Sequence, residues 1–454
     1  MTATSHERMS SVDTAWLRMD TPGNAMVIVG VMATATPLRW GRFRRLLASR
    51  FLGFPRFRQR PVQDALGASW VEDKRFDLDA HVKRVALPEP AGRTELEALA
   101  ADLASTPLDS NRPMWQAHLV ERYLGGSAWI LRIHHCYADG VAMMKVLLSM
   151  TEHEAVPAPT HGARRGAAEG ARLIDGGFQY LLRPEQAVSY ALQAGAMVGE
   201  LARVLALPDD PETPLRGSLS GLKRVAWAGP IPLHEVKAVG KALDCTVNDV
   251  LMSTVAGALG GHLREHEFDV TDLAVRAAVP VNLRGADETP ALGNRFGLVF
   301  VDLPLGIRSP LQRVYAVHDT MQSLKGSMQP SMTLMVLGLM GLLPAAVQSP
   351  AIEALSRKGS LVASNVAGPQ VPLFMCGQRI SEMYFWVPQS GTMGVGISIL
   401  SYAGQVFFGL IADRSLNVEP RSVMDRIGPE FERLLLAVTV GALAAKEWQR
   451  RPSV

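Results

Sequence analysis

The chain has 454 residues, of which 48% are hydrophobic and 20% are charged, and its formal net charge is +3. This length fits two domains of about 150–220 residues better than one, and the apolar content excludes a chain that is disordered throughout. The small net charge gives no support for nucleic acid as a partner. Three cysteines without C-x-x-C spacing, Cys136, Cys245 and Cys376, indicate a reducing, cytosolic setting without a disulfide framework or zinc ribbon.

The pattern of residues 25–150 predicts strands and helices in alternation. Residues 25–35 form an apolar run rich in Val and Ile, which predicts a buried strand. Thr94 and Glu97 have the spacing of a capping box, which predicts a helix over 94–105. Further along we expect strands over 115–122 and 127–134, a turn at Gly125-Gly126 between them, and a helix over 140–150.

The composition changes after residue 155. Residues 156–169 contain Pro, Gly, Ala and Arg without an apolar period, and the helical pattern over 173–207 ends at Pro208 and Pro211. We therefore expect an N-terminal domain over 1–155, a linker or crossover with a helix over 156–225, and a C-terminal domain over 226–454.

The second half mixes helices and strands without strict βαβ alternation, which predicts an α+β fold with mixed sheets. The expected helices cover 234–243, 247–265, 309–325, 331–347 and 423–440. The expected strands cover 273–283, 295–305, 360–367, 380–387 and 395–412, the last folded into a hairpin at Ala403-Gly404.

Two adjacent histidines, His134 and His135, follow an apolar strand, and Asp139 and Gly140 come shortly after them. An imidazole can accept a proton from a hydroxyl during nucleophilic attack. Two other interpretations are an ordinary loop and a metal site, although no third cluster of metal ligands lies nearby in the sequence. Because neighbours on a strand point to opposite faces, a Cys136–His135 nucleophile pair is not expected.

The chain resembles the bacterial wax ester synthase/acyl-CoA:diacylglycerol acyltransferases, and more broadly the acyltransferases similar to chloramphenicol acetyltransferase. The HHxxxDG motif over 134–140 defines the superfamily. The narrower resemblance is carried by segments spread over about residues 9–440: Ser11-Val12-Asp13, Thr21-Pro22, Asn24-Ala25-Met26, Pro113-Met114-Trp115, Asn248-Asp249, Pro280–Arg284, Gly293-Asn294, Ser364–Pro369, Ser401-Tyr402, Gly404, Gly409 and Asp413. Met114 and Ala367 depart from the family pattern, where Leu and Pro are usual.

The resemblance implies two chloramphenicol-acetyltransferase-like domains, each a mixed sheet with flanking helices, and an active-site channel between them. It makes His135 the general base and His134 and Gly140 shaping residues. Asp139 is expected to form an ion pair with an arginine, for which Arg284 is the candidate; a solvated surface arginine is the alternative.

Several further site candidates come from the matched motifs. Asn248 (with its neighbour Asp249), Ser364 and Asn365 are candidates to stabilise the oxyanion or to support the structure around it. Asn248 could instead cap the helix that follows it, and residues 364–369 could instead form a turn. Pro113, Met114 and Trp115 are candidates for the substrate channel, with core packing as the alternative.

The resemblance implies an O-acyltransferase that moves a long-chain acyl group from acyl-CoA to a fatty alcohol or a diacylglycerol. Acyl-CoA is then a substrate, and neither a metal nor a bound cofactor is expected. One alternative is a related acyltransferase with a carrier-protein donor or another acceptor. Another is a non-catalytic lipid-binding paralogue, against which the intact HHxxxDG motif argues.

Two segments bear on lipid surfaces. Residues 39–60 contain eight arginines, five aromatic residues and no acid, which suits an anionic membrane or lipid-droplet surface, the phosphates of CoA, or a solvated helix with its aromatics in the core. Residues 331–347 are apolar nearly all round, as in a core helix or the wall of a lipid channel. Neither this run nor the first 18 residues is typical of a spanning helix or signal peptide, so we expect a cytoplasmic protein associated peripherally with membrane or lipid droplets.

Overall fold

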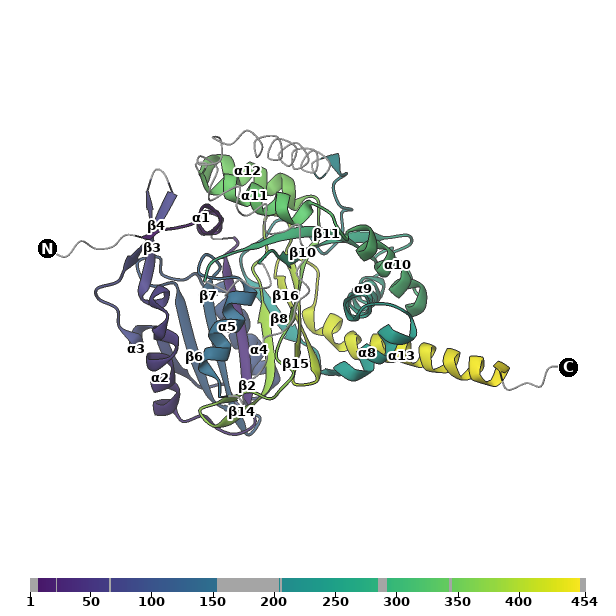
Figure 1. Cartoon of the computed structure of the whole chain (residues 1–454), viewed down its shortest axis with the longest axis horizontal. Helices are drawn as coiled ribbons and strands as arrows, with labels where there is room; N and C mark the ends of the chain where they lie inside the picture. The colour runs from purple at the N-terminus through teal and green to yellow at the C-terminus, as the bar shows by residue number, and fades with distance from the viewer. Residues whose placement is uncertain are drawn as a thin grey trace, which may run out of the picture.

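Two mixed β-sheets form the centre of the structure, with helices packed around them (Figure 1). The computed structural model describes residues 7–21, 23–64, 67–152, 204, 206–284, 292–342 and 345–449. Most of the predicted linker, including nearly all of the helical pattern over 173–207, lies outside these residues. The two mixed sheets with flanking helices confirm the predicted α+β class.

The first sheet contains the strand that leads to the histidine pair. β2 runs antiparallel to β7 along its whole length, with Val27 opposite His134, so the apolar run over 25–35 lies in the middle of this sheet. β5 runs parallel to β6, which makes the sheet mixed. The strand order is β13 (Phe374–Met375), β14 (Gln378–Trp386), β2 (Val27–Thr34), β7 (Gly126–His134), β6 (Trp115–Tyr123) and β5 (Val82–Val85).

The second sheet comes from the second half of the chain. β10, β12 and β15 run parallel to one another, whereas β11, β16 and β8 are antiparallel to their neighbours. The strand order is β11 (Phe296–Pro304), β10 (Ala274–Asn282), β12 (Leu361–Ala367), β15 (Val395–Tyr402), β16 (Gln405–Asp413) and β8 (Lys223–Trp227), and β9 (Ile231–Pro232) pairs with β16. A small third sheet contains β1 (Glu7–Arg8), β4 (Gly67–Glu72) and β3 (Gln59–Asp64).

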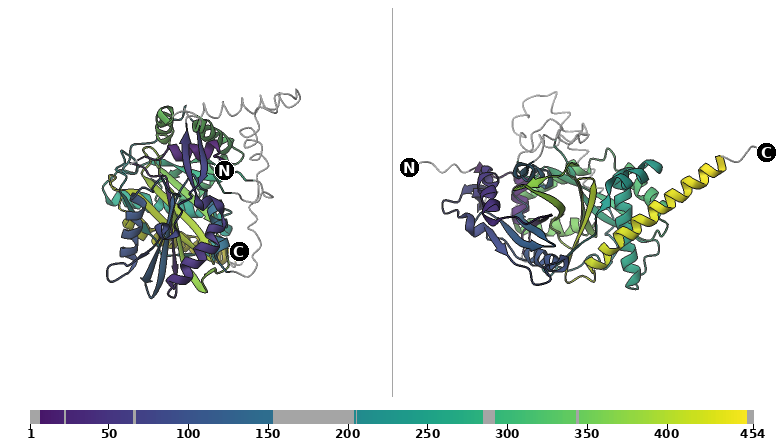
Figure 2. Two further views of the ribbon diagram at one scale, coloured as in Figure 1. Left: turned by 90° about the vertical axis from the view of Figure 1, so that its left-hand side faces the viewer. Right: turned by 90° about the horizontal axis from the view of Figure 1, so that it is seen from below.

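Helices cover each sheet and the space above both. α9, α10 and α13 pack on one another beside the second sheet, whereas α1 packs on α11 above the two sheets (Figures 1 and 2). The helices of the first half are α1 (Ser11–Arg18), α2 (Trp40–Ser49), α3 (Leu78–His81), α4 (Arg93–Ser105) and α5 (Gly140–Met150). Those of the second half are α8 (Leu233–Ala242), α9 (Val247–Glu265), α10 (Pro310–Ser323), α11 (Gln329–Leu342), α12 (Ala345–Ser356) and α13 (Pro420–Gln449).

The chain returns to the first sheet after it has built most of the second. β13 and β14 lie far along the sequence, yet β14 pairs with β2 at the centre of the first sheet. A single cut of the chain at residue 226 therefore does not separate the two sheets. The exact position of the linker stays a prediction.

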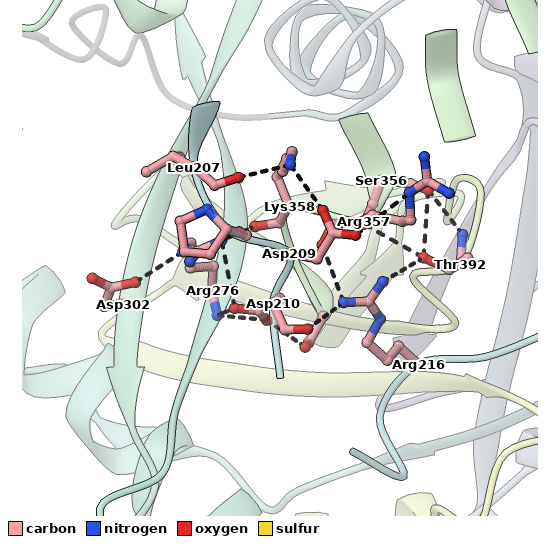
Figure 3. Close-up of polar contacts among 12 residues, drawn as sticks. Leu207, Asp209, Asp210, Arg216, Arg276, Asp302, Ser356, Arg357, Lys358 and Thr392 are labelled. Atoms are coloured by element: carbon pink, nitrogen blue, oxygen red, sulfur yellow. Dashed lines mark hydrogen bonds and ion pairs between the residues drawn. The ribbon is translucent and has the colours of Figure 1, made fainter. Parts of the chain in front are cut away.

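The end of the predicted linker is part of the folded structure. Asp210 accepts hydrogen bonds from the backbone of Arg276 at 2.9 and 3.1 Å and from Ser360 Oγ at 2.5 Å, and Arg216 donates to the Asp210 carbonyl at 2.7 Å (Figure 3). Lys358 Nζ contacts Asp209 Oδ1 at 2.8 Å in the same cluster (Figure 3). These contacts fix residues 207–216 against β10 and the segment before β12.

Two local predictions are wrong. α4 begins at Arg93, and it is Glu95, not Glu97, that accepts the backbone N–H of the residue before the helix, Gly92, at 2.9 Å. Glu97 is buried instead, where it accepts the Trp227 N–H at 3.1 Å and pairs with Arg421, so that it joins the two halves of the chain. The helix predicted over 331–347 ends at Leu342, and a second helix, α12, follows it.

The arginine-rich segment, residues 39–60, folds into α2, two short 3₁₀ helices (Phe51–Gly53 and Pro55–Arg58) and the start of β3. Phe43, Phe51 and Phe57 are fully buried in the core of the first half. Trp40 and Phe54 pack partly against that core as well. The aromatic residues therefore serve packing, whereas Arg42 and Arg45 lie on the exposed face of α2.

Candidate active site

The histidine pair lies in the turn between β7 and α5, at the junction of the two sheets. His134 is the last residue of β7 and is fully buried. Its Nδ1 accepts the Cys136 N–H at 3.2 Å, and its Nε2 lies 3.6 Å from Asp20 Oδ2. These contacts make His134 a support of the turn. Cys136 is buried as well, and burial raises the pKa of its thiol well above the usual range. A thiol with a raised pKa is a poor nucleophile, in line with the expectation that Cys136 and His135 do not form a nucleophile pair.

His135 forms part of the wall of an apolar cavity, which we call the His135 pocket and which has about 1260 Å³ of space between its atoms when its opening to solvent is included. The imidazole stacks on Trp16 of α1, with ring centroids 4.2 Å apart and an angle of 12° between the planes. Phe296 of β11 lines the same pocket, and its ring centroid lies 5.6 Å from that of the imidazole. Residues of α11, among them Thr333, Val336, Leu337 and Met340, complete the wall, so the apolar helix both packs in the core and lines the cavity.

The environment of His135 favours the neutral imidazole. Burial lowers the pKa of His135 to about 4, and the weaker opposing effects of its own backbone carbonyl and of Asp139 do not compensate. Nδ1 is shielded from solvent and has no hydrogen-bond partner among the residues that the structure describes. Because Nδ1 is shielded, Nε2 is the ring nitrogen that remains for a molecule in the pocket.

The backbone of His135 is held by a buried amide and a buried carboxylate. Asn294 Nδ2 donates to the His135 carbonyl at 2.8 Å and to Asp13 Oδ1 at 2.8 Å. Asp13 also accepts the Asn294 N–H at 3.0 Å, and burial raises the pKa of Asp13 to about 6. This arrangement fixes the histidine turn to α1 and to the start of β11.

Asp139 joins the histidine turn to the second half of the chain. Its Oδ1 accepts the Ala142 N–H at 3.0 Å and so caps α5. Its Oδ2 accepts hydrogen bonds from Arg284 Nη1 at 2.5 Å and from the Arg295 N–H at 2.9 Å. Both Asp139 and Arg284 are buried, which confirms the predicted ion pair and excludes a solvated surface arginine.

The oxyanion candidates divide into two groups. Ser364 and Asn365 of β12 line the His135 pocket together with Asp139 and Gly140. Asn248 is absent from that wall, and its Oδ1 accepts a hydrogen bond from Asn365 Nδ2 at 2.8 Å. The alternative interpretation of Asn248 as a helix cap is wrong, because the Thr246 side chain caps α9.

Asp249 has a structural environment. Its Oδ2 accepts the Thr246 N–H at 2.8 Å, which completes the capping box at the start of α9. The same carboxylate contacts His318 Nδ1 at 2.8 Å. Asp249 therefore forms structural contacts within the helices beside the second sheet, and it does not line the His135 pocket.

The channel candidates Pro113, Met114 and Trp115 do not line the His135 pocket. Met114 and Trp115 are buried in the core of the first half, where Trp115 Nε1 donates to the Phe57 carbonyl at 2.8 Å. The Met114 carbonyl accepts the His134 N–H at 2.9 Å. These contacts favour the alternative of core packing for Met114 and Trp115, which support the histidine turn, whereas a role in a substrate channel stays a prediction.

Several residues at the site were not predicted as site residues: Trp16, Phe296, Asn294, Asp13 and Asp20. Asp13 and Asn294 belong to segments that carry the family resemblance, which is the one signal that the sequence contains for them. Trp16 and Phe296 look like ordinary core residues in the sequence, and only the fold brings them to His135.

Substitution Asp139→Ala tests the role of the buried ion pair. It leaves Arg284 buried without a counter-charge and removes the cap of α5. We expect the free energy of unfolding to fall by about 3–5 kcal/mol in denaturant titrations. The matched control is Asp79→Ala, which breaks the exposed, solvent-screened pair Arg44–Asp79 and should lower the free energy of unfolding far less. Equal losses in the two variants would contradict this role.

Comparisons with known proteins identify the family of this chain. The model of the wax ester synthase/diacylglycerol acyltransferase catalytic domain matches residues 9–251, and the model of the C-terminal domain of the same family matches residues 292–435. A probable diacylglycerol O-acyltransferase, tgs1, from Mycobacterium tuberculosis H37Rv is 31% identical over 375 residues, 79% of each chain. A putative diacylglycerol O-acyltransferase of the same organism, Rv3087, is 29% identical over 475 residues, 96% of this chain and 98% of the relative.

Solved structures share the fold. The wax ester synthase/diacylglycerol acyltransferase from Marinobacter aquaeolei VT8 is 21% identical, with a TM-score of 0.69 over 95% of this chain and all of that chain. The first condensation domain of the calcium-dependent antibiotic synthetase is 16% identical, with a TM-score of 0.60 over 95% and 96% of the two chains. The two-domain architecture similar to chloramphenicol acetyltransferase is therefore confirmed, and the chain belongs to the wax ester synthase/diacylglycerol acyltransferase family.

Proposed function

We propose that this protein is an O-acyltransferase that moves a long-chain acyl group from acyl-CoA to the hydroxyl of a fatty alcohol or a diacylglycerol, with His135 as the general base. The family and the relatives that are named diacylglycerol O-acyltransferases support O-acyl transfer. The observation that carries the proposal is a neutral, buried imidazole on the wall of a large apolar cavity.

The reaction needs one proton acceptor and one attacking oxygen. In the proposed mechanism the acceptor hydroxyl gives its proton to Nε2 of His135, and its oxygen forms a bond to the thioester carbonyl carbon. The carbon–sulfur bond then breaks, and the proton passes from His135 to the departing CoA sulfur. Because burial keeps His135 unprotonated at neutral pH, the imidazole is ready to accept the proton when the substrates arrive.

The tetrahedral intermediate carries a negative oxygen that needs a hydrogen-bond donor. Ser364 is the proposed donor, because its buried side chain lines the same pocket as His135 and no hydrogen bond to another described residue occupies its hydroxyl. Removal of one such donor typically costs about 10²–10³-fold in rate. Asn248 is assigned a positioning role, since it contacts Asn365 and is not part of the pocket wall.

Both proposed substrates are apolar, so we propose that the enzyme works at a membrane or lipid-droplet surface. None of the helices that the structure describes has the length and hydropathy needed to cross a bilayer. Arg39, Arg42 and Arg45 are exposed and have no acidic partner within salt-bridge distance among the described residues. Each such residue can add about 1 kcal/mol of attraction to an anionic surface.

The base assignment is tested by two alanine variants. His135→Ala should lower kcat/KM by about 10²–10⁴-fold, because the proton acceptor is lost, and should still yield a folded protein. His134→Ala should retain more activity per folded molecule, since His134 supports the turn and does not line the pocket. Release of CoA from palmitoyl-CoA, with hexadecanol or a diacylglycerol as acceptor, gives the rates. An inactive His134→Ala beside an active His135→Ala would reverse the assignment.

The surface proposal is tested with vesicles that contain phosphatidylglycerol. The double variant Arg42→Ser/Arg45→Ser should co-sediment less with these vesicles, and binding of the unaltered protein should weaken as the Debye length falls from about 10 Å at 0.1 M salt to about 3 Å at 1 M. The matched control, Lys237→Ser/Lys241→Ser, removes two charges from exposed positions of α8 and should bind normally. If vesicle binding changes neither with salt nor with the two arginine substitutions, the proposal is wrong and α2 is an ordinary solvated helix.

A further inference from the structure

A second cavity, which we call the α5 cavity, lies between α5 and the first sheet and has about 710 Å³ of space between its atoms when its opening to solvent is included. Its floor is one face of β14, β2 and β7, and its roof is α5, which Figure 1 shows beside these strands. The side chains that line it are apolar apart from Tyr384, and five of them are methionines: Met32, Met143, Met144, Met150 and Met383. Methionine adapts its shape readily, so such a wall accommodates a flexible hydrocarbon.

A glycine at the centre of the floor creates this space. Gly30 lies in register between Phe385 of β14 and Leu131 of β7, and all three residues line the α5 cavity. A Cβ atom placed on Gly30 would meet nothing closer than the Tyr384 carbonyl oxygen at 3.9 Å. A glycine inside a strand weakens the sheet and often marks the close approach of a ligand. A side chain at this position would project into the cavity and would not clash with the backbone.

The α5 cavity adjoins the His135 pocket. Gly140 and Val366 line both the α5 cavity and the His135 pocket. From this shared edge the floor extends away from the histidine turn, because Val27 is opposite His134 whereas Met32 is opposite Trp129. The roof extends in the same direction for the length of α5, about 15 Å at 1.5 Å per residue. A chain in this cavity therefore has one end beside His135 and the other beneath the end of α5.

We propose that the α5 cavity holds the hydrocarbon chain of the acyl donor, an inference that rests on the proposed function. The two cavities differ in the chemistry of their walls. The His135 pocket includes polar side chains, among them Asn282, Ser364, Asn365 and Ser390, which suit the hydroxyl and ester groups of an acceptor such as a diacylglycerol. The α5 cavity lacks such a group along α5 and β2, so it suits a single unbranched chain whose thioester carbon emerges at Gly140.

Substitution of Gly30 tests this assignment. Gly30→Leu fills the middle of the floor, so chains that need the distal half no longer fit, while a butyryl chain ends before the obstruction. Met144→Trp narrows the same cavity from the roof and provides a second variant if the sheet does not tolerate leucine. The matched control is Gly428→Leu on α13, where a Cβ atom would meet nothing within 4 Å and which lies outside both cavities.

Two measurements separate the donor chain from the acceptor chain. The first is kcat/KM, measured for butyryl-CoA and for palmitoyl-CoA with the same acceptor. The same quantity is then measured for a series of alcohols of different chain length with the same donor. The second is calorimetric binding of S-hexadecyl-CoA, a thioether that cannot react, against CoA itself. In Gly30→Leu we expect the palmitoyl-to-butyryl ratio to fall by about 10- to 100-fold, with weaker thioether binding, unchanged CoA binding and an unchanged alcohol series.

The other outcomes have definite meanings. A Gly30→Leu variant that binds the thioether normally and keeps its donor preference would overturn the proposal. A variant with normal donor preference and a shortened alcohol series would assign the α5 cavity to the acceptor and overturn it as well. If the unaltered protein turns over no acyl-CoA but loses thioether binding on substitution of Gly30, the proposed function fails while the assignment of the cavity to an acyl chain stands.

Discussion

The carboxylate of Asp139 accepts hydrogen bonds from both halves of the chain, and the geometry around His135 depends on it. One oxygen caps α5, which roofs the α5 cavity, and the other binds Arg284 and the backbone of Arg295 beside β11. A buried charge of this kind is stable only while its partner stays in place. The turn that carries His135 therefore has one position relative to Trp16 and Phe296, and a rigid imidazole is what the proposed proton transfer from a bound hydroxyl requires.

The structure combines a rigidly held His135 with adaptable apolar walls around it. Asn294 and Asp13 hold the backbone of His135, and Trp16 covers the imidazole face, so the imidazole has little freedom. The walls that extend from this centre are rich in methionine and leucine from α5 and α11. Such a division is physically reasonable for an enzyme of lipids, because the reacting atoms need precise placement whereas hydrocarbon chains need only dry, apolar space.

Much of the fold could be predicted from the sequence, because apolar periodicity and turns are local signals. The run over 25–35, the turn at Gly125-Gly126 and the hairpin at Ala403-Gly404 agree with β2, the β6–β7 turn and the β15–β16 turn. The return of β14 to the first sheet could not be predicted, since strand pairing over such a sequence distance leaves no local pattern. The Asp139–Arg284 pair was predicted through the family resemblance and not through spacing.

The site was predictable to the extent that its residues form motifs. One pocket brings together five of the predicted site residues: His135, Asp139, Gly140, Ser364 and Asn365. Trp115 belongs to the core instead. Glu97, which was predicted to cap a helix, joins the two halves of the chain. The sequence alone does not distinguish a motif tryptophan that contacts substrate from one that supports a strand. Only the direction of its side chain in the folded sheet distinguishes the two roles.

The central claim is that His135 is held dry and neutral on the wall of its pocket. Nuclear magnetic resonance of protein with ¹³C-labelled histidine measures this directly, with the His135 signal assigned by its loss in His135→Gln. The predicted result is an imidazole that stays neutral as the pH falls through 6.5, the usual pKa of histidine, and becomes protonated only near pH 4. A midpoint at or above 6.5 would contradict the account, because the imidazole would then be solvated or paired and no longer enclosed as the structure shows.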